Sequence, residues 1–458
     1  MRPGSLYVQA AGLPSAAVGV RRRIRGGHHH VHRPHLPGSG VHHAPTAVHH
    51  FHQAAPPYAD AVFAFVFAAA VALLLTPLAA RFARRIGAVD KPTSRGLAGG
   101  GTPLLGGLAI LAAVLLAGAI WMPETLKLSH KVGGAPGSGG TVHTWTIAAG
   151  AILIALVGAI DDYRALSPPV KLVGQIAAAV VVVEGGAVVT DITLPFIGGL
   201  QFPNTGGMLT VIWLVAMMNV VNFSDGVDGL AAGLCTIDGI AFAVIAFDLQ
   251  VGAGGVLAAL TAGAALGFLF HNFPPAKVFM GDSGANLLGY LLGVVAVVSS
   301  LKKSVLVALA VPLLILAVPF LDTGFVVAKR LKYRRKPWSA DANHFHHRMA
   351  RIGFSERKTV IYLYGWTLLL AGVAMALRFV PYSDHHGHYH LGWSLMMAGI
   401  GLVAIAASLY LIYVLEILKF KRLRSRQLRA LDPDTTEHEI QAAVQRDIET
   451  GEFERLAK

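Results

Sequence analysis

The sequence predicts an all-α, polytopic membrane protein with about eleven transmembrane helices, an external N-terminus and a cytoplasmic C-terminus. Of its 458 residues, 54% are hydrophobic and only 14% are charged, whereas a soluble domain carries about 25% charged residues. Many apolar stretches reach the roughly 20 residues that cross the hydrocarbon of a bilayer. The stretches are continuous and lack the alternation of a membrane β-barrel. The single cysteine, Cys235, gives no basis for a disulfide framework.

The composition divides the chain into three regions. Residues 1–57 are rich in His, Arg, Pro and Gly, cannot build a core, and are expected to form a disordered extension. Residues 58–418 contain the apolar stretches and form the expected transmembrane domain. Residues 419–458 mix basic and acidic side chains and are expected to form a cytoplasmic tail.

Eleven spans are expected in the transmembrane domain, each with ends uncertain by several residues. They lie roughly at 59–80, 102–121, 144–160, 169–189, 207–223, 229–247, 253–270, 284–300, 304–328, 359–379 and 392–416. Basic residues cluster after the first, the ninth and the last of these spans. Lys and Arg concentrate in cytoplasmic loops. With eleven spans and an external N-terminus, all three basic clusters fall on the cytoplasmic side, which supports this count.

The net charge of +13 is therefore interpreted as a membrane property. A strongly basic chain can bind nucleic acid, but here the basic residues follow spans, where they contact anionic lipids. We expect these basic residues to contact a lipid bilayer and not nucleic acid.

Five aspartates lie at the expected cytoplasmic ends of spans: Asp161, Asp162, Asp225, Asp228 and Asp282. Carboxylates at the edge of hydrocarbon are costly and usually functional. The adjacent pair, Asp161 and Asp162, disfavours joint ionisation unless a cation is near. The pattern predicts a polyanionic pocket at the membrane surface for a divalent metal and a phosphorylated substrate. A polar helix cap is the simpler alternative for the pair.

The densest motif covers residues 219–230. Asn219, Asn222, Asp225 and Asp228 recur every third residue, so they share one polar face if the helix continues. Glycines between them allow a turn and a close backbone approach to a ligand. Asn and Asp oxygens are hard ligands that suit Mg²⁺. An ordinary turn between helices is the alternative.

Two further segments carry polar side chains on the same side. Residues 271–284 contain two prolines that end a span, and glycines that flank Asp282, for which metal ligation is favoured over a plain turn. Residues 341–348 contain three histidines and Arg348, which favour phosphate recognition. A zinc site and a solvated basic loop are the alternatives there. Lys171 and Gln175 share a face of the fourth span.

At these segments the chain resembles the polyprenyl-phosphate N-acetylhexosamine-1-phosphate transferases of glycosyltransferase family 4, from about Ala59 into the last spans. The resemblance implies transfer of a sugar phosphate from a UDP-sugar to a polyprenyl phosphate, with release of UMP, at the cytoplasmic face of the plasma membrane. It implies Mg²⁺, or Mn²⁺, as cofactor and allows a homodimer. The form of residues 344–348 is similar to the branch that uses UDP-N-acetylglucosamine for surface glycans such as teichoic acid and lipopolysaccharide. The phospho-MurNAc-pentapeptide transferases are the alternative branch.

The resemblance also assigns roles. Catalytic roles are implied for Asp161, Asp162 and Asp228, with Asp161 as candidate base, and metal ligation for Asn222 and Asp282. The expected substrate-binding residues are Asp225, Phe279, Lys171, Asn272, His344, His346, His347, Arg348 and Arg95. The chain departs from the family at Gly96 and Ala98, where a basic residue and a histidine are common, and at Ala285, where serine is usual.

Several alternatives remain open at this stage. The lipid phosphate could attack the UDP-sugar directly, or an aspartate could attack first and form a covalent intermediate. A cation transporter is the rival from another class, although transporters carry acids near the midplane and inverted repeats, and neither is found. An inactive scaffold that keeps the fold is a third possibility, which the departures at Gly96 and Ala98 keep open.

Overall fold

The computed structural model describes residues 57–90, 101–127, 141–189, 191–194, 198–202, 204–299, 317, 320–321, 355–380, 390–432, 434 and 436–449. The chain divides into two units, residues 1–54 and 55–458, and every described residue belongs to the second. The expected disordered extension lies outside the described residues except for Pro57, so its disorder stays a prediction.

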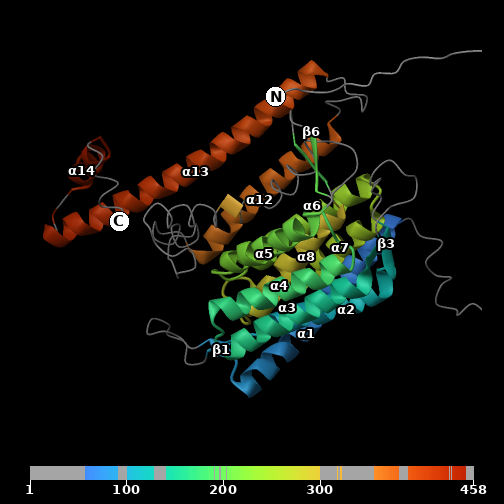
Figure 1. Cartoon of the computed structure of the whole chain (residues 1–458). Coiled ribbons are helices and arrows are strands. Elements are labelled where there is room, and N and C mark those ends of the chain that lie inside the picture. The colour runs from blue at the N-terminus through green and yellow to red at the C-terminus, as the bar shows by residue number, and fades with distance from the viewer. Residues whose placement is uncertain are drawn as a thin grey trace, which may run out of the picture. The chain divides into compact units, whose positions relative to one another are not determined.

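The second unit is built from helices, which confirms the predicted all-α class (Figure 1). The helices are α1 (Pro57–Ile86), α2 (Gly106–Trp121), α3 (Thr144–Tyr163), α4 (Pro168–Glu184), α5 (Gly206–Ser224), α6 (Leu230–Asp248), α7 (Gly252–Asn272), α8 (Gly281–Ser299), α12 (Glu356–Phe379), α13 (Leu391–Leu431) and α14 (Glu437–Glu449). Three short antiparallel ribbons join some of them: β1 (Val89–Asp90) with β2 (Thr102–Pro103), β3 (Thr125–Lys127) with β4 (Thr141–His143), and β5 (Asp191–Leu194) with β6 (Gly198–Gln201).

The apolar helices confirm a polytopic membrane protein. Eight of the described helices are long and apolar enough to cross a bilayer, and α2 is apolar but shorter. Ten of the eleven expected spans coincide with a described helix. The remaining one, 304–328, lies almost wholly outside the described residues, so the count of eleven and the direction of the termini stay predictions.

Several helix ends differ from the expected spans, and two of the differences have a clear local reason. α1 continues to Ile86, so Arg81, Arg84 and Arg85 lie on its last turns and not in a loop. Arginine favours helix, and its charge interacts well with the helix C-terminus. α2 begins at Gly106 and not at residue 102, because Thr102 and Pro103 pair with β1.

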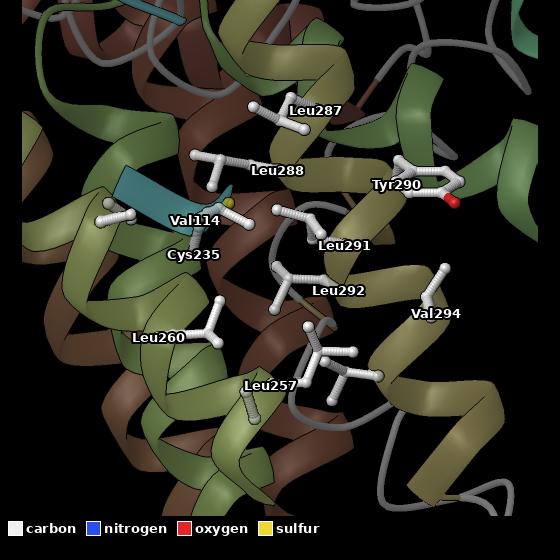
Figure 2. Packing of buried hydrophobic residues seen from close by; sticks show 14 of the residues in the cluster. Val114, Cys235, Leu257, Leu260, Leu287, Leu288, Tyr290, Leu291, Leu292 and Val294 are labelled. Atoms are coloured by element: carbon white, nitrogen blue, oxygen red, sulfur yellow. The ribbon is translucent and has the colours of Figure 1, made fainter. Parts of the chain in front are cut away.

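Helix α8 forms the centre of the packed core. Every residue from Ser283 to Ser299 is buried, as expected for a helix that is apolar on all sides. Figure 2 shows leucines of α8 in contact range of Leu257 and Leu260 from α7, with Val114 of α2 and Cys235 of α6 beside them. Because α8 also carries Asp282 in its first turn, the most buried of the described membrane-spanning helices holds a site residue.

Small residues let α1 and α7 approach closely. A Cβ atom added at Gly263 or Gly267 would lie 2.1 Å from the backbone oxygens of Phe65 and Ala69 in α1. Association of helices in lipid depends on such close packing, since water provides no driving force between apolar faces there. The contact fixes α7, whose C-terminal end leads into the site.

The C-terminal helices attach through α12, which packs against α6. The indole N–H of Trp366 in α12 donates to the hydroxyl of Ser408 in α13 over 3.2 Å. α13 is 41 residues long and continues through Lys419, where the sequence predicts the start of the tail. The helix is continuous across residue 418, so its backbone does not mark the expected boundary between the membrane domain and the tail.

Candidate active site

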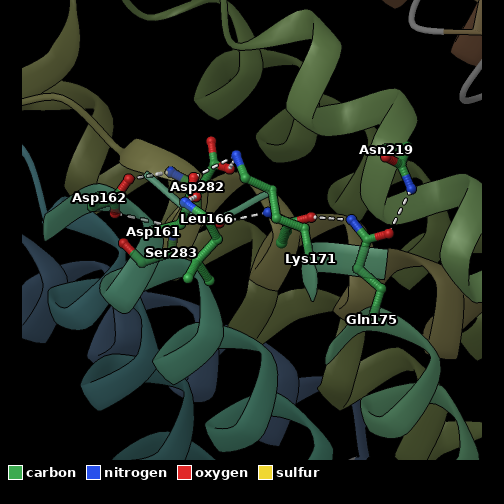
Figure 3. Close-up of polar contacts among 9 residues, drawn as sticks. Asp161, Asp162, Leu166, Lys171, Gln175, Asn219, Asp282 and Ser283 are labelled. Atoms are coloured by element: carbon green, nitrogen blue, oxygen red, sulfur yellow. Dashed lines mark hydrogen bonds and ion pairs between the residues drawn. The ribbon is translucent and has the colours of Figure 1, made fainter. Parts of the chain in front are cut away.

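Asp162 joins the end of α3 to the start of α8. Its two carboxylate oxygens accept hydrogen bonds from the backbone N–H groups of Asp282, over 2.7 Å, and Ser283, over 3.2 Å (Figure 3). The first N–H groups of a helix have no partner within it and carry partial positive charge, which favours a carboxylate there. The predicted meeting of Asp162 and Asp282, 120 residues apart, is confirmed.

Gly281 makes this junction possible. Its φ of +70° is a left-handed conformation that favours glycine. A Cβ atom at this position would lie 2.3 Å from an oxygen of Asp162. Glycine is therefore required both by the backbone and by the carboxylate that lies against it.

Lys171, in the first turn of α4, lies between two site carboxylates. Its ammonium group is 2.5 Å from Asp161 and 2.8 Å from Asp282. The other oxygen of Asp161 accepts from the backbone N–H of Leu166 over 2.7 Å. Both oxygens of Asp161 thus have a partner, Lys171 for one and the N–H of Leu166 for the other. To act as the expected base, Asp161 must first release one of them.

The motif at the end of α5 divides between helix and turn. α5 ends at Ser224, so Asn219 and Asn222 lie on the helix, whereas Asp225 and Asp228 lie in the turn that follows. The continuous polar face expected for all four residues is therefore interrupted after Asn222. Gly229, with φ +76°, immediately precedes α6 and lets the chain reverse sharply.

Asp225 and Asp228 face the loop between α7 and α8 in different ways. One oxygen of Asp228 accepts from the backbone N–H of Ala276 over 2.8 Å. Asp225 accepts no hydrogen bond from another described residue. Burial, together with the charges of Asp282, Asp162 and Asp228, raises the pKa of Asp225 well above its usual range. Its carboxylate is the least compensated acidic group of the site.

Asn272 connects the α5–α6 turn to the α7–α8 loop. Its side-chain oxygen accepts from the N–H of Gly229 and its amide nitrogen donates to the carbonyl of Val278, each over 2.9 Å. The residue is only 2% exposed. This geometry favours a positioning role over the direct substrate contact that the sequence suggests.

Phe279 is held by the chain just before α2. Its N–H donates to the carbonyl of Pro103 over 2.9 Å, and its carbonyl accepts from the N–H of Gly106 over 3.1 Å. These bonds place the residue between the first connecting loop and the start of α8, beside the acids. Its contact with a nucleotide base stays a prediction.

A chain of three amides lies next to the carboxylates; the sequence analysis singled out Asn219 and Gln175 but missed Asn286. Asn219 donates to Gln175, Gln175 donates to Asn286, and Asn286 donates to the backbone carbonyl of Asp282, over 2.8 to 2.9 Å (Figure 3). The only sequence signal for Asn286 is its position one turn after Asp282, in an otherwise apolar helix.

Helix α12 also begins at this end of the bundle. Arg357 donates through Nε to the carbonyl of Pro274 over 2.8 Å, and the hydroxyl of Tyr364 donates to the carbonyl of Gly229 over 2.5 Å. The expected ligand residues His344, His346, His347 and Arg348 precede α12 in the sequence. They and Arg95 lie outside the described residues.

The donor set fits a divalent cation in part. Among the described residues, no group of three or more His, Cys, Asp or Glu side chains forms a complete metal site. Mg²⁺, however, is usually bound by one or two carboxylates together with substrate phosphates and water, and not by an all-protein cage. The uncompensated Asp225 and the acids near it, with Asn222 one turn earlier, supply hard oxygen atoms of the required kind.

Comparison with known proteins identifies the family. The profile described as Glycosyl transferase family 4 matches residues 144–300, which run from the start of α3 past the end of α8. A probable undecaprenyl-phosphate N-acetylglucosaminyl 1-phosphate transferase of Bacillus subtilis is 34% identical over 331 residues, or 69% of this chain and 84% of the relative. The chain belongs to glycosyl transferase family 4. The family resemblance predicted from the four motifs is therefore confirmed.

Two branches of family 4 are represented among the relatives. A decaprenyl-phosphate N-acetylglucosaminephosphotransferase of Mycolicibacterium smegmatis is 35% identical over 65% of this chain and 77% of its own. A phospho-N-acetylmuramoyl-pentapeptide-transferase of Moorella thermoacetica is 32% identical over 68% of this chain and 96% of its own. The muramoyl-pentapeptide transferases are the more distant relatives.

Proposed function

We propose that this protein transfers N-acetylhexosamine-1-phosphate, with GlcNAc-1-phosphate as the first candidate, from a UDP-sugar to a polyprenyl phosphate and releases UMP. The observation that carries the proposal is the gathering of five aspartates at one end of the helices. Lys171 joins Asp161 to Asp282, Asp162 holds the N–H of Asp282, and Asp225 lies within the charge field of Asp282, Asp162 and Asp228. The relatives named for GlcNAc-1-phosphate transfer support this choice of sugar.

The position of the site suits one soluble and one membrane-bound substrate. The C-terminal ends of α3, α5 and α7 and the N-terminal ends of α4, α6 and α8 supply the site residues, so it lies at a membrane surface. The arginines of α1 lie at the same end. Because basic residues favour the inside, we place the site at the cytoplasmic face of the plasma membrane.

The residues of the site divide the chemical tasks. Asp282, Asn222 and Asp225 are the candidates to hold Mg²⁺, which when bound would screen the diphosphate and stabilise charge on the transferred group. The carboxylates of Asp162 and Asp228 mainly accept hydrogen bonds from backbone N–H groups. They therefore position α8 and the α7–α8 loop around the reacting groups.

Lys171 couples the binding of substrate phosphate to the action of Asp161 as the base. An incoming phosphate is an anion that competes with Asp161 and Asp282 for the ammonium group of Lys171. When Lys171 turns toward phosphate, one oxygen of Asp161 becomes free to accept the proton of the lipid phosphate. The deprotonated phosphate then attacks the β-phosphorus of the UDP-sugar, the bond to the UMP oxygen breaks, and UMP leaves.

Purified protein tests the proposal directly. With undecaprenyl phosphate, Mg²⁺ and UDP-GlcNAc, the wild type should release UMP, and a parallel assay with UDP-MurNAc-pentapeptide should give little product. Asp282→Ala should abolish release, and Asp161→Asn should remove most of it because an amide cannot accept the proton. Asp248→Ala is the matched control, since this acid pairs with Arg378 at the other end of α6.

Three outcomes would contradict the proposal. Undiminished turnover by Asp282→Ala would remove its metal role, and equal loss in Asp248→Ala would make the effect non-specific. Uptake of Mg²⁺ by proteoliposomes without UMP formation would favour the cation transporter. The homodimer and the assignment to teichoic acid or lipopolysaccharide synthesis stay predictions. Measuring the molecular mass of the protein in detergent tests the homodimer.

A further inference from the structure

The amide chain defined by Asn219, Gln175 and Asn286 lies one helical turn from the site. Gln175 follows Lys171 by four residues on α4, and Asn286 follows Asp282 by four residues on α8. Residues four apart share a helix face, one turn or about 5.4 Å along the axis. The chain therefore forms a neutral polar layer directly below the charged groups, toward the membrane interior.

The hydrogen bonds of the chain fix its direction. The amide nitrogen of Asn286 donates to the carbonyl of Asp282, which can only accept, so its oxygen must face Gln175. Gln175 then presents nitrogen to Asn286 and oxygen to Asn219. The nitrogen of Asn219 also donates to the carbonyl of Val215 over 2.8 Å. Turning over any one amide would place like atoms against each other, so the arrangement is unique.

Burial makes these bonds consequential. Gln175 is 5% exposed and Asn286 is 4% exposed. A buried amide that loses its partner costs about 1–3 kcal/mol, whereas an apolar replacement of both partners can be nearly neutral. Gln175 and Asn286 are therefore constrained to stay together, with the partly buried Asn219 as the further partner of Gln175.

The chain connects α4 to α8, two helices that otherwise make little contact. α4 packs against α3 and α5, and α5 packs against α8, but α4 and α8 make little direct contact. The bond between Gln175 and Asn286 and the ion pair between Lys171 and Asp282 are the polar side-chain links between α4 and α8 in the described part of the chain. Substrate phosphate would weaken the second link by attracting Lys171, and the first link would remain.

We propose that Gln175 and Asn286 are positioning residues for the transfer reaction, because they hold α4 against α8 while Lys171 leaves Asp282 for the substrate. This inference rests on the proposed function. The amides suit the task because they carry no charge. They neither compete with the carboxylates for a cation nor exchange protons during turnover.

The variants Asn286→Leu and Gln175→Leu, singly and together, test the inference. Trp213→Phe is the matched control, because the indole of Trp213 donates to the carbonyl of Gly293 over 3.2 Å and so also links α8 to a neighbouring helix, farther from the site. Three measurements are made on each variant: kcat and KM for UMP release, the Mg²⁺ concentration for half-maximal rate, and melting temperature in detergent. Titration with Mn²⁺ followed by electron paramagnetic resonance reports metal binding without turnover.

Each single Leu variant should lower kcat about ten- to a hundred-fold, the loss expected from a misplacement near 1 Å. Each single variant leaves a buried amide without a partner and should lower the melting temperature, as Trp213→Phe should by removing one hydrogen bond. The double variant should lose no more rate than the worse single variant. Wild-type kcat with unchanged Mg²⁺ dependence in Asn286→Leu would overturn the inference, as would an equal loss of kcat in Trp213→Phe.

Failure of the proposed function gives a different result. In that case the wild type itself forms no UMP, and the positioning role is judged by Mn²⁺ affinity alone. Weaker Mn²⁺ binding in Asn286→Leu than in Trp213→Phe would still support the positioning role, and equal binding would overturn it.

Discussion

Replacing Gly281 by alanine tests whether the junction between Asp162 and α8 organises the site. The position has φ +70°, and a Cβ atom there would lie 2.3 Å from a carboxylate oxygen of Asp162. Alanine therefore faces two separate penalties, one from its backbone conformation and one from steric overlap.

The two penalties can be sized from the structure. A left-handed conformation costs an L-residue about 1–2 kcal/mol. Relief of the overlap moves the carboxylate away from the N–H groups of Asp282 and Ser283, and loss of a helix cap costs about 0.5–2 kcal/mol. We expect Gly281→Ala to lose about 1.5–4 kcal/mol of stability. It should also lose up to about a hundred-fold in kcat, since Asp162 and Asp282 would be displaced.

Gly87 provides a control that separates the two effects. It has φ +82°, but a Cβ atom there would meet nothing within 4 Å. Gly87→Ala should therefore carry the backbone penalty alone and keep its turnover. Melting temperatures in detergent and UMP release, measured side by side on both variants, isolate the contribution of the carboxylate.

A clear result would refute this reasoning. If Gly281→Ala melted at the same temperature as Gly87→Ala and kept wild-type kcat, the contact between residue 281 and Asp162 would have no influence on the site.

Two other residues give predictions of their own. Burial and neighbouring carboxylates raise the pKa of Asp225. Protonated Asp225 therefore stabilises the metal-free protein. This stability is fully present below the ordinary carboxyl pKa, roughly 4, and is lost as the pH rises through the raised pKa. Asp225→Asn should flatten the fall of melting temperature with rising pH in EDTA, and an unchanged slope would show that Asp225 is not perturbed. Asp238, in α6, is 1% exposed and neither carboxyl oxygen has a hydrogen-bond partner among the described residues. Asp238→Leu should stabilise the protein by about 1–3 kcal/mol, measured by thermal unfolding, and leave UMP release unchanged; a lower melting temperature would show that the carboxyl has a stabilising partner.

The fold could be predicted because membrane spans are a local property. About twenty consecutive apolar residues suffice to indicate a span, and ten of the eleven expected spans coincide with helices. Boundaries were less predictable, since they depend on pairing with distant segments. Thr102 reads as the start of a span but pairs with Asp90 in a ribbon.

The site was predictable in its membership more than in its contacts. Counting spans placed the five aspartates on one side; the contact of Asp162 with Asp282 and the bridge of Lys171 from Asp161 to Asp282 confirm this for three of them. Spacing along the sequence could not show that Lys171 lies between Asp161 and Asp282, which is 111 residues away from it. For the same reason Asn286 was missed, and the bonds of Asn272 to Gly229 and Val278 could not be predicted.

The lysine between two aspartates has a consequence for biogenesis. Neighbouring negative charges would push the ends of α3 and α8 apart during insertion into the bilayer. Lys171 acts as an internal counter-ion, so these helix ends can come together before any dissolved ion or nucleotide arrives. A newly made chain can therefore bring these helix ends together without magnesium, because Lys171 offsets part of their negative charge, and the charge that remains is available to attract the first metal ion.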